Sequence, residues 1–224
     1  MNDSPVNPNN MVETSDSLEA VGVFRAWKNT FFVIVVICLF LTQAAFWAVD
    51  LGFIETPGAI KPAETAQPGA TASADEESAD GGLLHSVLGE LDFDLVGRVI
   101  GVANGILIVS GILFALTVFF CLMVSLVGRL GGINHISRAF ILALILAALI
   151  IPWQRLLGSN VVGVAYGSDE LLRWLDSKGA GVPNLIFYYL RFTGLWLVVL
   201  LLMIMAQVRS SGWSKSILRR LEII

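Results

Sequence analysis

The sequence predicts an all-α, polytopic integral membrane protein with four transmembrane helices and short amphipathic surface helices. Of its 224 residues, 56% are hydrophobic and only 14% are charged, whereas a soluble domain carries about 25% charged residues. The mean hydropathy is +0.77. The apolar residues are gathered into long runs, and a membrane-spanning helix needs about 20 mainly apolar residues.

The first fifth of the chain predicts a tail, a lead-in segment and one span. Residues 1–14 predict a disordered cytoplasmic tail, and residues 15–30 predict an amphipathic segment before the membrane. Residues 31–49 are almost wholly apolar and predict the first transmembrane helix. The preceding segment is long and contains acidic residues, unlike the short basic start of a signal peptide. We therefore expect a retained membrane anchor.

An acidic loop and a surface helix are expected next. Residues 50–82 are rich in Pro, Ala, Thr, Gly and acidic residues, which cannot bury enough apolar surface to offset the entropy of ordering. They predict a disordered outer loop. Residues 83–96 place leucines at helical spacing and predict a surface helix. Residues 97–128 predict a second span, longer than one crossing requires, and tilt can absorb the excess.

The third span is the shortest. Residues 129–137 predict a short cytoplasmic loop, and residues 138–155 predict the span that follows. This run is uncharged only between Arg138 and Arg155. Arginines at the ends of a span can snorkel toward the headgroups and extend its reach. A re-entrant hairpin is the alternative for this segment.

The C-terminal part predicts an outer loop, a fourth span and a basic tail. Within the loop of residues 156–184, residues 168–178 predict a short helix. Acidic residues occupy its first turn, where they suit the helix dipole, and Gly179 follows its end. Residues 185–208 predict the fourth span, and residues 209–224 a basic amphipathic cytoplasmic tail.

The distribution of charge predicts the topology. Lysines and arginines gather in both tails and in the loop of residues 129–137, whereas the first outer loop is acidic. Basic residues in short segments near the ends of spans favour the cytoplasmic side. Both termini are therefore expected in the cytoplasm, and the expected location is the bacterial inner (cell) membrane.

Three glycines recur every four residues in the stretch GRVIGVANG, at Gly97, Gly101 and Gly105. A dinucleotide-binding G-x-G-x-x-G needs a different spacing and a preceding strand, so we expect no cofactor here. Small residues four apart on an apolar helix let two helices approach closely. The third span repeats the pattern at Ala139, Ala143 and Ala147. These six residues are predicted helix-packing positions, either between the two spans or between two copies of the chain.

Polar side chains inside spans are candidate functional residues because their burial in lipid is costly. The main ones are Arg98, Asn104 and Arg191. Asp94 lies four residues before Arg98 and predicts a local ion pair. Asn104 predicts a hydrogen bond between helices.

Arg191 lies about two turns inside the longest version of the fourth span. Snorkelling or an ion pair with a carboxylate at the same level, on Asp50, Asp92 or Asp94, is the expected structural role. Binding of a coupling ion or a substrate is the alternative.

The sequence indicates no catalytic centre. It contains no metal-spaced cluster, no phosphate-binding loop and no pair of inward-facing carboxylates, since no Asp or Glu occurs between Asp94 and Asp169. We expect no catalytic residue, no metal ion and no nucleic-acid partner. The expected partners are the lipid bilayer and other membrane subunits or further copies of the chain.

Two functions are compatible with this pattern. The first is a non-enzymatic scaffold, assembly factor or accessory subunit of a larger membrane complex. The second is a small-solute transporter or channel subunit, in which Arg98, Asn104 and Arg191 would line an outer polar vestibule.

Overall fold

The structure is a computed structural model that describes residues 8–54, 93–128, 132–157, 163–178 and 181–220, and these contain helices but no strand. In chain order the elements are α1 (Pro8–Asp50), α3 (Phe93–Val127), α4 (Ile133–Ile150), α5 (Trp153–Leu157), α6 (Ser168–Lys178), α7 (Val182–Tyr189), the π-helix η1 (Leu190–Gly194) and α8 (Leu195–Arg220).

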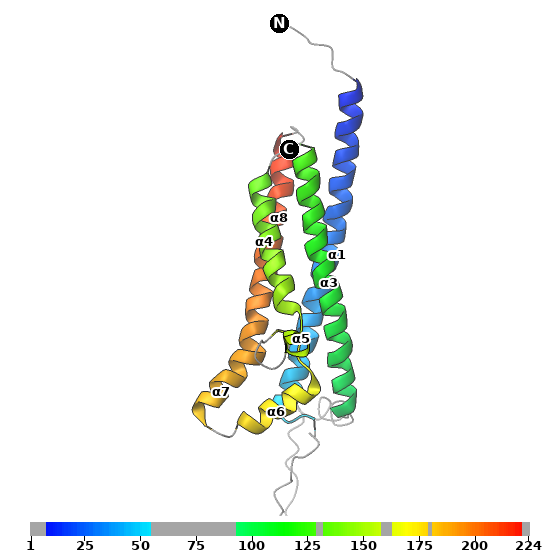
Figure 1. Cartoon of the computed structure of the whole chain (residues 1–224). Helices are drawn as coiled ribbons and strands as arrows, with labels where there is room; N and C mark the ends of the chain where they lie inside the picture. Colours follow the sequence, from blue (N-terminus) through cyan, green and yellow to red (C-terminus); the bar gives the residue numbers. More distant parts are fainter. Residues whose placement is uncertain (1–7, 55–92, 129–131, 158–162, 179–180, 221–224) are drawn as a thin grey trace, which may run out of the picture.

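The long helices form an up-and-down bundle (Figure 1). Helix α1 packs along α3, α3 along α4, and α4 along α8, while α8 makes a smaller contact with α1. Four stretches are long and apolar enough to cross a membrane, namely Glu19–Asp50, Phe93–Val127, Ile133–Ile150 and Val182–Trp213. The N-terminus of α1 and the C-terminus of α8 lie at the same end of the bundle, and α5, α6 and α7 lie at the other end (Figure 1).

Helix boundaries near the first two spans differ from those predicted. Helix α1 begins at Pro8, so residues 8–14 are helical rather than part of a disordered tail. Proline suits the first turn of a helix, and no glycine or further proline interrupts the segment before Gly22. The predicted lead-in of residues 15–30 and the first span are therefore one continuous helix.

The prediction for residues 83–96 is wrong at its C-terminal end, because α3 begins at Phe93. Residues 93–96 thus belong to the second long helix. The remainder of that predicted surface helix, and the predicted outer loop apart from residues 50–54, lie outside the described residues.

The third span is shifted toward the N-terminus of its predicted range. Helix α4 begins at Ile133 after Gly132, whose φ of 71° lies in the left-handed region, so the predicted loop of residues 129–137 is shorter. The helix ends at Ile150, because Ile151 precedes Pro152 and adopts an extended conformation with ψ of 132°.

The C-terminal segments are more continuous than predicted. Helix α7, η1 and α8 follow one another without a break. Residues 209–220, predicted as a separate amphipathic tail, continue α8.

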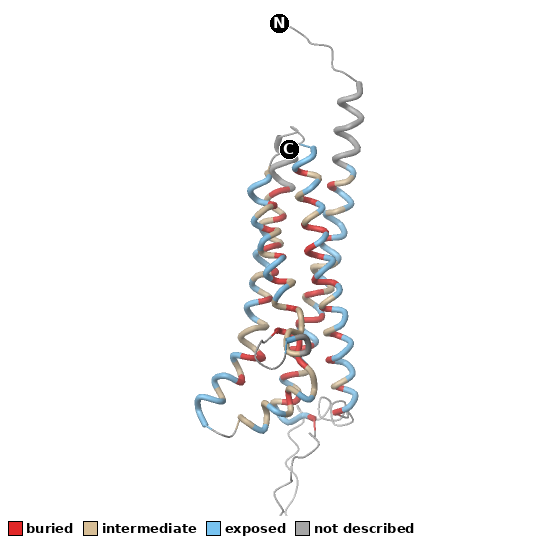
Figure 2. The backbone as a smooth tube through the Cα atoms, viewed as in Figure 1, coloured by how far each residue is buried: buried red, intermediate tan, exposed pale blue. Residues whose placement is uncertain are grey.

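Buried positions recur along the long helices (Figure 2), and most of the buried side chains are apolar. One buried cluster joins all four long helices and includes Leu39, Phe114, Leu146 and Met203, each 0% exposed. A second cluster, around Phe46 and Tyr188, joins α1 and α3 to the short helices. Packing of this density gives each side chain a defined position.

Hydrogen bonds join α1 to α8. Lys28 Nζ donates to Ser210 Oγ at 3.0 Å, and Gln207 Nε2 donates to Asn29 Oδ1 at 2.9 Å. Further along, Trp196 Nε1 donates to the Leu39 carbonyl at 2.8 Å. Hydrogen bonds between apolar helices contribute about 0.6 to 2 kcal/mol each. They join two long helices whose packed interface is smaller than those of the other three neighbouring pairs of long helices.

Candidate functional site

Three short helices and an extended segment form a cap over the end of the bundle opposite the termini. The cap consists of α5, residues 163–167, α6 and α7 (Figure 1). Val164, Ala165 and Tyr166 are buried, although their backbone is not helical. Non-helical backbone at membrane depth is tolerated where protein surrounds it or where it lines a water-filled cavity.

Two hydrogen bonds anchor the extended segment. The Val164 N–H donates to the Leu149 carbonyl at 2.9 Å, and the Tyr166 hydroxyl donates to the Thr42 carbonyl at 2.6 Å. Burial raises the pKa of Tyr166, and the Arg191 charge opposes only part of this effect. The phenol therefore remains a hydrogen-bond donor at neutral pH.

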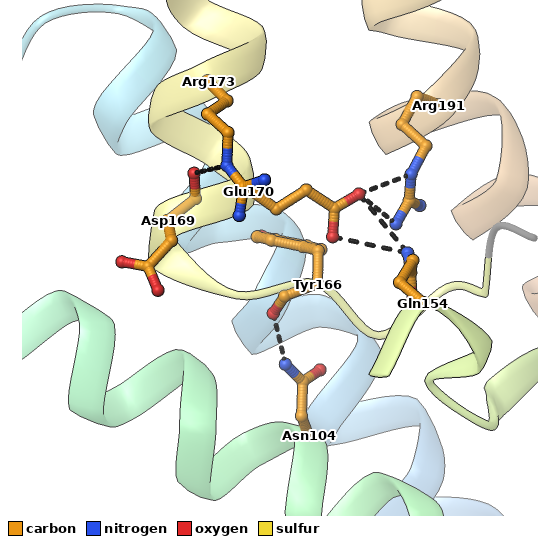
Figure 3. Close-up of polar contacts among 7 residues, drawn as sticks. All are labelled: Asn104, Gln154, Tyr166, Asp169, Glu170, Arg173 and Arg191. Carbon is orange, nitrogen blue, oxygen red and sulfur yellow. Dashed lines mark hydrogen bonds and ion pairs between the residues drawn. The ribbon is translucent and has the colours of Figure 1, made fainter. Parts of the chain in front are cut away.

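An ion pair joins the cap to the fourth long helical segment. Arg191 donates to Glu170 Oε1 from Nε at 3.0 Å and from Nη2 at 2.8 Å (Figure 3). Gln154 Nε2 lies 3.3 Å from both Glu170 carboxylate oxygens. The Arg191 side chain is 4% exposed and that of Glu170 is 21% exposed. The contacts bring together α5, α6 and η1.

The π-helix η1 contains Arg191. A π-helix inserts an extra residue into an α-helical segment and changes which side chains share a face. In η1, Arg191 and Phe192 are buried, and Thr193 Oγ1 lies 3.2 Å from the Gln43 side-chain amide. Arg191 thus contacts the cap, while Thr193 contacts α1.

A second charged cluster lies where the cap meets the end of α1. Asp50 accepts hydrogen bonds from Lys178 Nζ at 2.6 Å, Tyr188 at 2.9 Å and Tyr189 at 3.1 Å. The Asp50 side chain is 3% exposed. Burial lowers the pKa of Lys178, but its hydrogen bond to Asp50 and the charge of that carboxylate outweigh burial and raise it overall.

A cavity of about 470 Å³ separates α3 from the cap. Gly101, Asn104 and Gly105 line it from α3, and Glu170 and Arg173 line it from α6. Ligand pockets usually measure about 300–1,000 Å³, so the cavity is large enough to hold a small molecule or a lipid headgroup.

Asn104 connects the cavity wall to the extended segment. Its Nδ2 donates to the Tyr166 carbonyl at 2.7 Å (Figure 3). Its Oδ1 is buried and accepts no hydrogen bond from the residues that the structure describes. The predicted hydrogen bond between helices is therefore replaced by one to the segment leading into α6, and one acceptor is left facing no donor of the chain.

Compared with known proteins, the chain matches no family, no curated protein and no solved structure.

None of the three predicted glycine positions meets another long helix: Gly101 and Gly105 line the cavity, and Gly97 lies against α6. A Cβ on Gly97 would lie 3.3 Å from Ser168 of α6, whereas one on Gly101 or Gly105 would meet nothing within 4 Å. Both of the latter glycines are exposed. The predicted pairing of this ridge with the alanines of the third span is not formed, and contact with a second copy stays a prediction.

The alanines of α4 pack in the apolar cluster that joins the long helices, not against the glycines of α3. Ala139 and Ala143 are 0% exposed, and Ala147 packs at the edge of the same apolar cluster. The close approach of α3 to α4 occurs instead at Gly111, where a Cβ would lie 2.9 Å from the Ile150 side chain. The sequence spacing thus identified small residues without identifying the faces that they pack against.

The two predicted arginines have different environments. Arg98 is exposed, and the part of the chain that the structure describes holds no ion pair between it and Asp94. Arg191 is buried and paired, but with Glu170 rather than with Asp50, Asp92 or Asp94.

Sequence reasoning missed Glu170, Gln154 and Tyr166. In the sequence, Glu170 is one of the acidic residues expected in the first turn of the helix of residues 168–178. The same predicted topology places that loop on the side of Arg191, which was the signal that could have identified the partner.

Proposed function

We propose that this chain is a non-enzymatic integral membrane protein that acts as a scaffold, assembly factor or accessory subunit of a larger membrane complex. Its termini would be cytoplasmic, in the inner (cell) membrane of a bacterium. The observation that carries the proposal is that the buried charges link elements of the chain to one another. Glu170 and Arg191 fasten α6 to η1, and Asp50 and Lys178 fasten α1 to the end of α6.

This use of charge favours a structural role over a transport role. An ion pathway normally contains ionisable groups that face a water-filled route. Here Arg191 is 4% exposed on its side chain and is held by two hydrogen bonds to Glu170. The bundle interior between the long helices is packed with apolar side chains. The protein is therefore suited to act through its outer surfaces.

The outer surface is apolar on each of the long helices. Val33 and Ile37 of α1 are 51% and 53% exposed, and Val102 of α3 is 63% exposed. The short helix α7 also presents Ile186 and Phe187, which are 60% and 58% exposed. Lipid and the helices of other membrane proteins are the surroundings that suit such faces.

The proposal is tested by a native mass of the full-length protein extracted in mild detergent from its own membranes, with every co-purifying chain identified. We expect a stoichiometric foreign partner. A clean monomer or a homo-oligomer would contradict the accessory-subunit role.

Gly101→Leu tests whether the open glycine face of α3 is the contact. The first atom of the new side chain would meet nothing in the described chain, so the fold is expected to persist while the partner is lost. Gly22→Leu is the matched control, because Gly22 is also exposed and also has nothing within 4 Å of its Cβ position. Equal retention of the partner by both variants would show that this face is not the interface.

A small-solute transporter or channel subunit is the second candidate, and the cavity lined by Asn104 and Gln154 favours it. Reconstituted liposomes would then show solute flux that Asn104→Leu abolishes. Arg191→Ala suits this test less well, because it also breaks the ion pair with Glu170. Absence of flux for a panel of ions and small solutes would remove this candidate.

A further inference from the structure

We propose that the cavity between α3 and the cap binds the headgroup of a phospholipid that carries a primary amine, as phosphatidylethanolamine does. This inference goes beyond the proposed function, and it does not require a protein partner. It rests on the shape of the cavity, on one unused acceptor and on the two charges at its mouth.

The cavity owes its depth to two glycines. Gly101 and Gly105 line it, and nothing lies within 4 Å of the positions that their Cβ atoms would take. Exposed apolar residues of the same helix, Val102, Ile106 and Val109, lie within one turn of these glycines. A lipid could therefore place its headgroup in the cavity and its acyl chains along α3.

The unused acceptor is Asn104 Oδ1. The amide orientation is fixed, because Nδ2 donates to the Tyr166 carbonyl at 2.7 Å. Oδ1 is buried and receives no hydrogen bond from the described residues. A buried acceptor without a donor is unfavourable, so a ligand that brings an N–H group is favoured over one that does not.

Among the described residues that line the cavity, the titratable side chains leave one negative and one positive charge available. Glu170 is neutralised by Arg191. Asp169 and Arg173 are both exposed and both line the cavity. Within the described ranges no ion pair joins them, and the Asp169 carboxylate points away from the Arg173 guanidinium (Figure 3). Such an arrangement suits a zwitterion.

Each part of the headgroup has a complementary group. The ammonium would donate to Asn104 Oδ1 and Asp169 and lie near the Trp174 ring, which also lines the cavity. The phosphate would accept hydrogen bonds from Arg173, since guanidinium groups bind phosphate through paired donors. A choline headgroup has no N–H to offer Asn104, and a glycerol headgroup has no cation to offer Asp169.

The experiment measures lipid retention by the purified full-length protein. Native mass spectrometry would follow lipids bound from an equimolar mixture of phosphatidylethanolamine, phosphatidylcholine and phosphatidylglycerol. We expect about tenfold preferential retention of the ethanolamine lipid, the ratio that corresponds to about 1.4 kcal/mol. Equal retention of the three lipids would overturn the proposal.

Two variants and one control locate the site. Asn104→Leu removes the acceptor, and Asp169→Asn removes the negative charge from an exposed position, so the second variant is expected to fold even if the first loses its contact with Tyr166. Both should reduce the preference to near unity. Ser110→Ala is the control, because the Ser110 hydroxyl donates to the Ile106 carbonyl of its own helix and Ser110 does not line the cavity.

Two further results would also overturn the proposal. One is a folded Asp169→Asn protein with an unchanged lipid preference. The other is equally tight binding of water-soluble glycerophosphoethanolamine to the protein in phosphatidylcholine nanodiscs, which would identify a free metabolite rather than a lipid as the ligand.

Discussion

Arg191 is buried and, among the described residues, forms an ion pair with Glu170, so its side chain is sensitive to changes at Glu170. The pair lies at 2.8 Å, with Gln154 as a further donor to the same carboxylate. A buried charge that loses its partner keeps its desolvation cost without the compensating attraction. The ion pair thus joins α6 to η1, beside the ring contact between Trp174 and Phe192.

We expect Arg191→Met to destabilise the protein by about 1.5–3 kcal/mol, because Glu170, whose side chain is 21% exposed, would lose two charge-assisted hydrogen bonds and its cation. Unfolding by sodium dodecyl sulfate in mixed micelles measures this change. The double variant Arg191→Met with Glu170→Gln should recover much of the loss, since no charge is left unpaired. A loss below about 1 kcal/mol in the single variant would contradict the role of the pair, because that is the range of exposed ion pairs.

The contact between Lys178 and Asp50 predicts a dependence of stability on alkaline pH. The pKa of Lys178 is raised above its ordinary value of 10.5. A raised pKa means that the folded state favours the protonated amine, so its contribution is fully present below pH 10.5 and disappears as the pH rises through the higher folded-state value.

Resistance to unfolding is therefore expected to fall as the pH rises above 10.5, the ordinary pKa of the amine, and less steeply in Lys178→Met. Measurement of the unfolding midpoint across this range checks the difference. Identical pH profiles for the two proteins would exclude a contribution from Lys178.

At the scale of helices, the environments of three glycines predict three different responses to alanine. Gly101 has nothing near its Cβ position, Gly111 has the end of the flexible Ile150 side chain at 2.9 Å, and Gly163 has the Ile151 carbonyl oxygen within clashing distance. The Ile151 backbone carbonyl cannot move away from an added Cβ, whereas the end of the Ile150 side chain can.

Gly101→Ala should therefore stabilise the protein by up to about 1 kcal/mol through helix propensity, Gly111→Ala should change its stability little, and Gly163→Ala should lower it most. The order of the three unfolding midpoints is the measurement. A Gly163→Ala protein as stable as the parent would contradict the close approach of the extended segment to α4.

The sequence predicted the existence of the long helices better than their contacts. Runs of apolar residues are a local property, and four such runs correspond to the four long apolar stretches. The spacing of the glycines also predicts a helix face that another segment can approach closely, but it does not identify that segment. For Gly97, that segment is the N-terminus of α6, which lies about 70 residues further along the chain.

The partner of Arg191 could not be predicted from the sequence for a similar reason. Several carboxylates share its predicted level, and only the packing of the cap selects Glu170 over Asp50. The cavity was also unpredictable, because it arises where α4 ends at Ile150 and α3 continues past it.

At the scale of the whole molecule, the bundle predicts that both ends of the chain lie on one side of the membrane and the cap on the other. Single cysteines at Ser4 and Ser216 should therefore react with an impermeant thiol reagent from the same side, and one at the exposed Asp176 of α6 from the opposite side. Native Cys38 and Cys121 are buried and would be replaced by alanine for this assay. Labelling of all three positions from one side would contradict a four-span topology.

Because of the π-helix, the number of residues in one segment of the chain cannot change without altering the contacts on either side of it. Deletion of a single residue from Leu190–Gly194 would restore regular α-helical hydrogen bonding, but it would rotate everything before it by about 100° relative to α8. Arg191 would then leave Glu170, and Tyr188 would leave Asp50, although neither residue had been replaced. Among homologues of this protein, length changes should thus be excluded from this segment even where its amino acids vary.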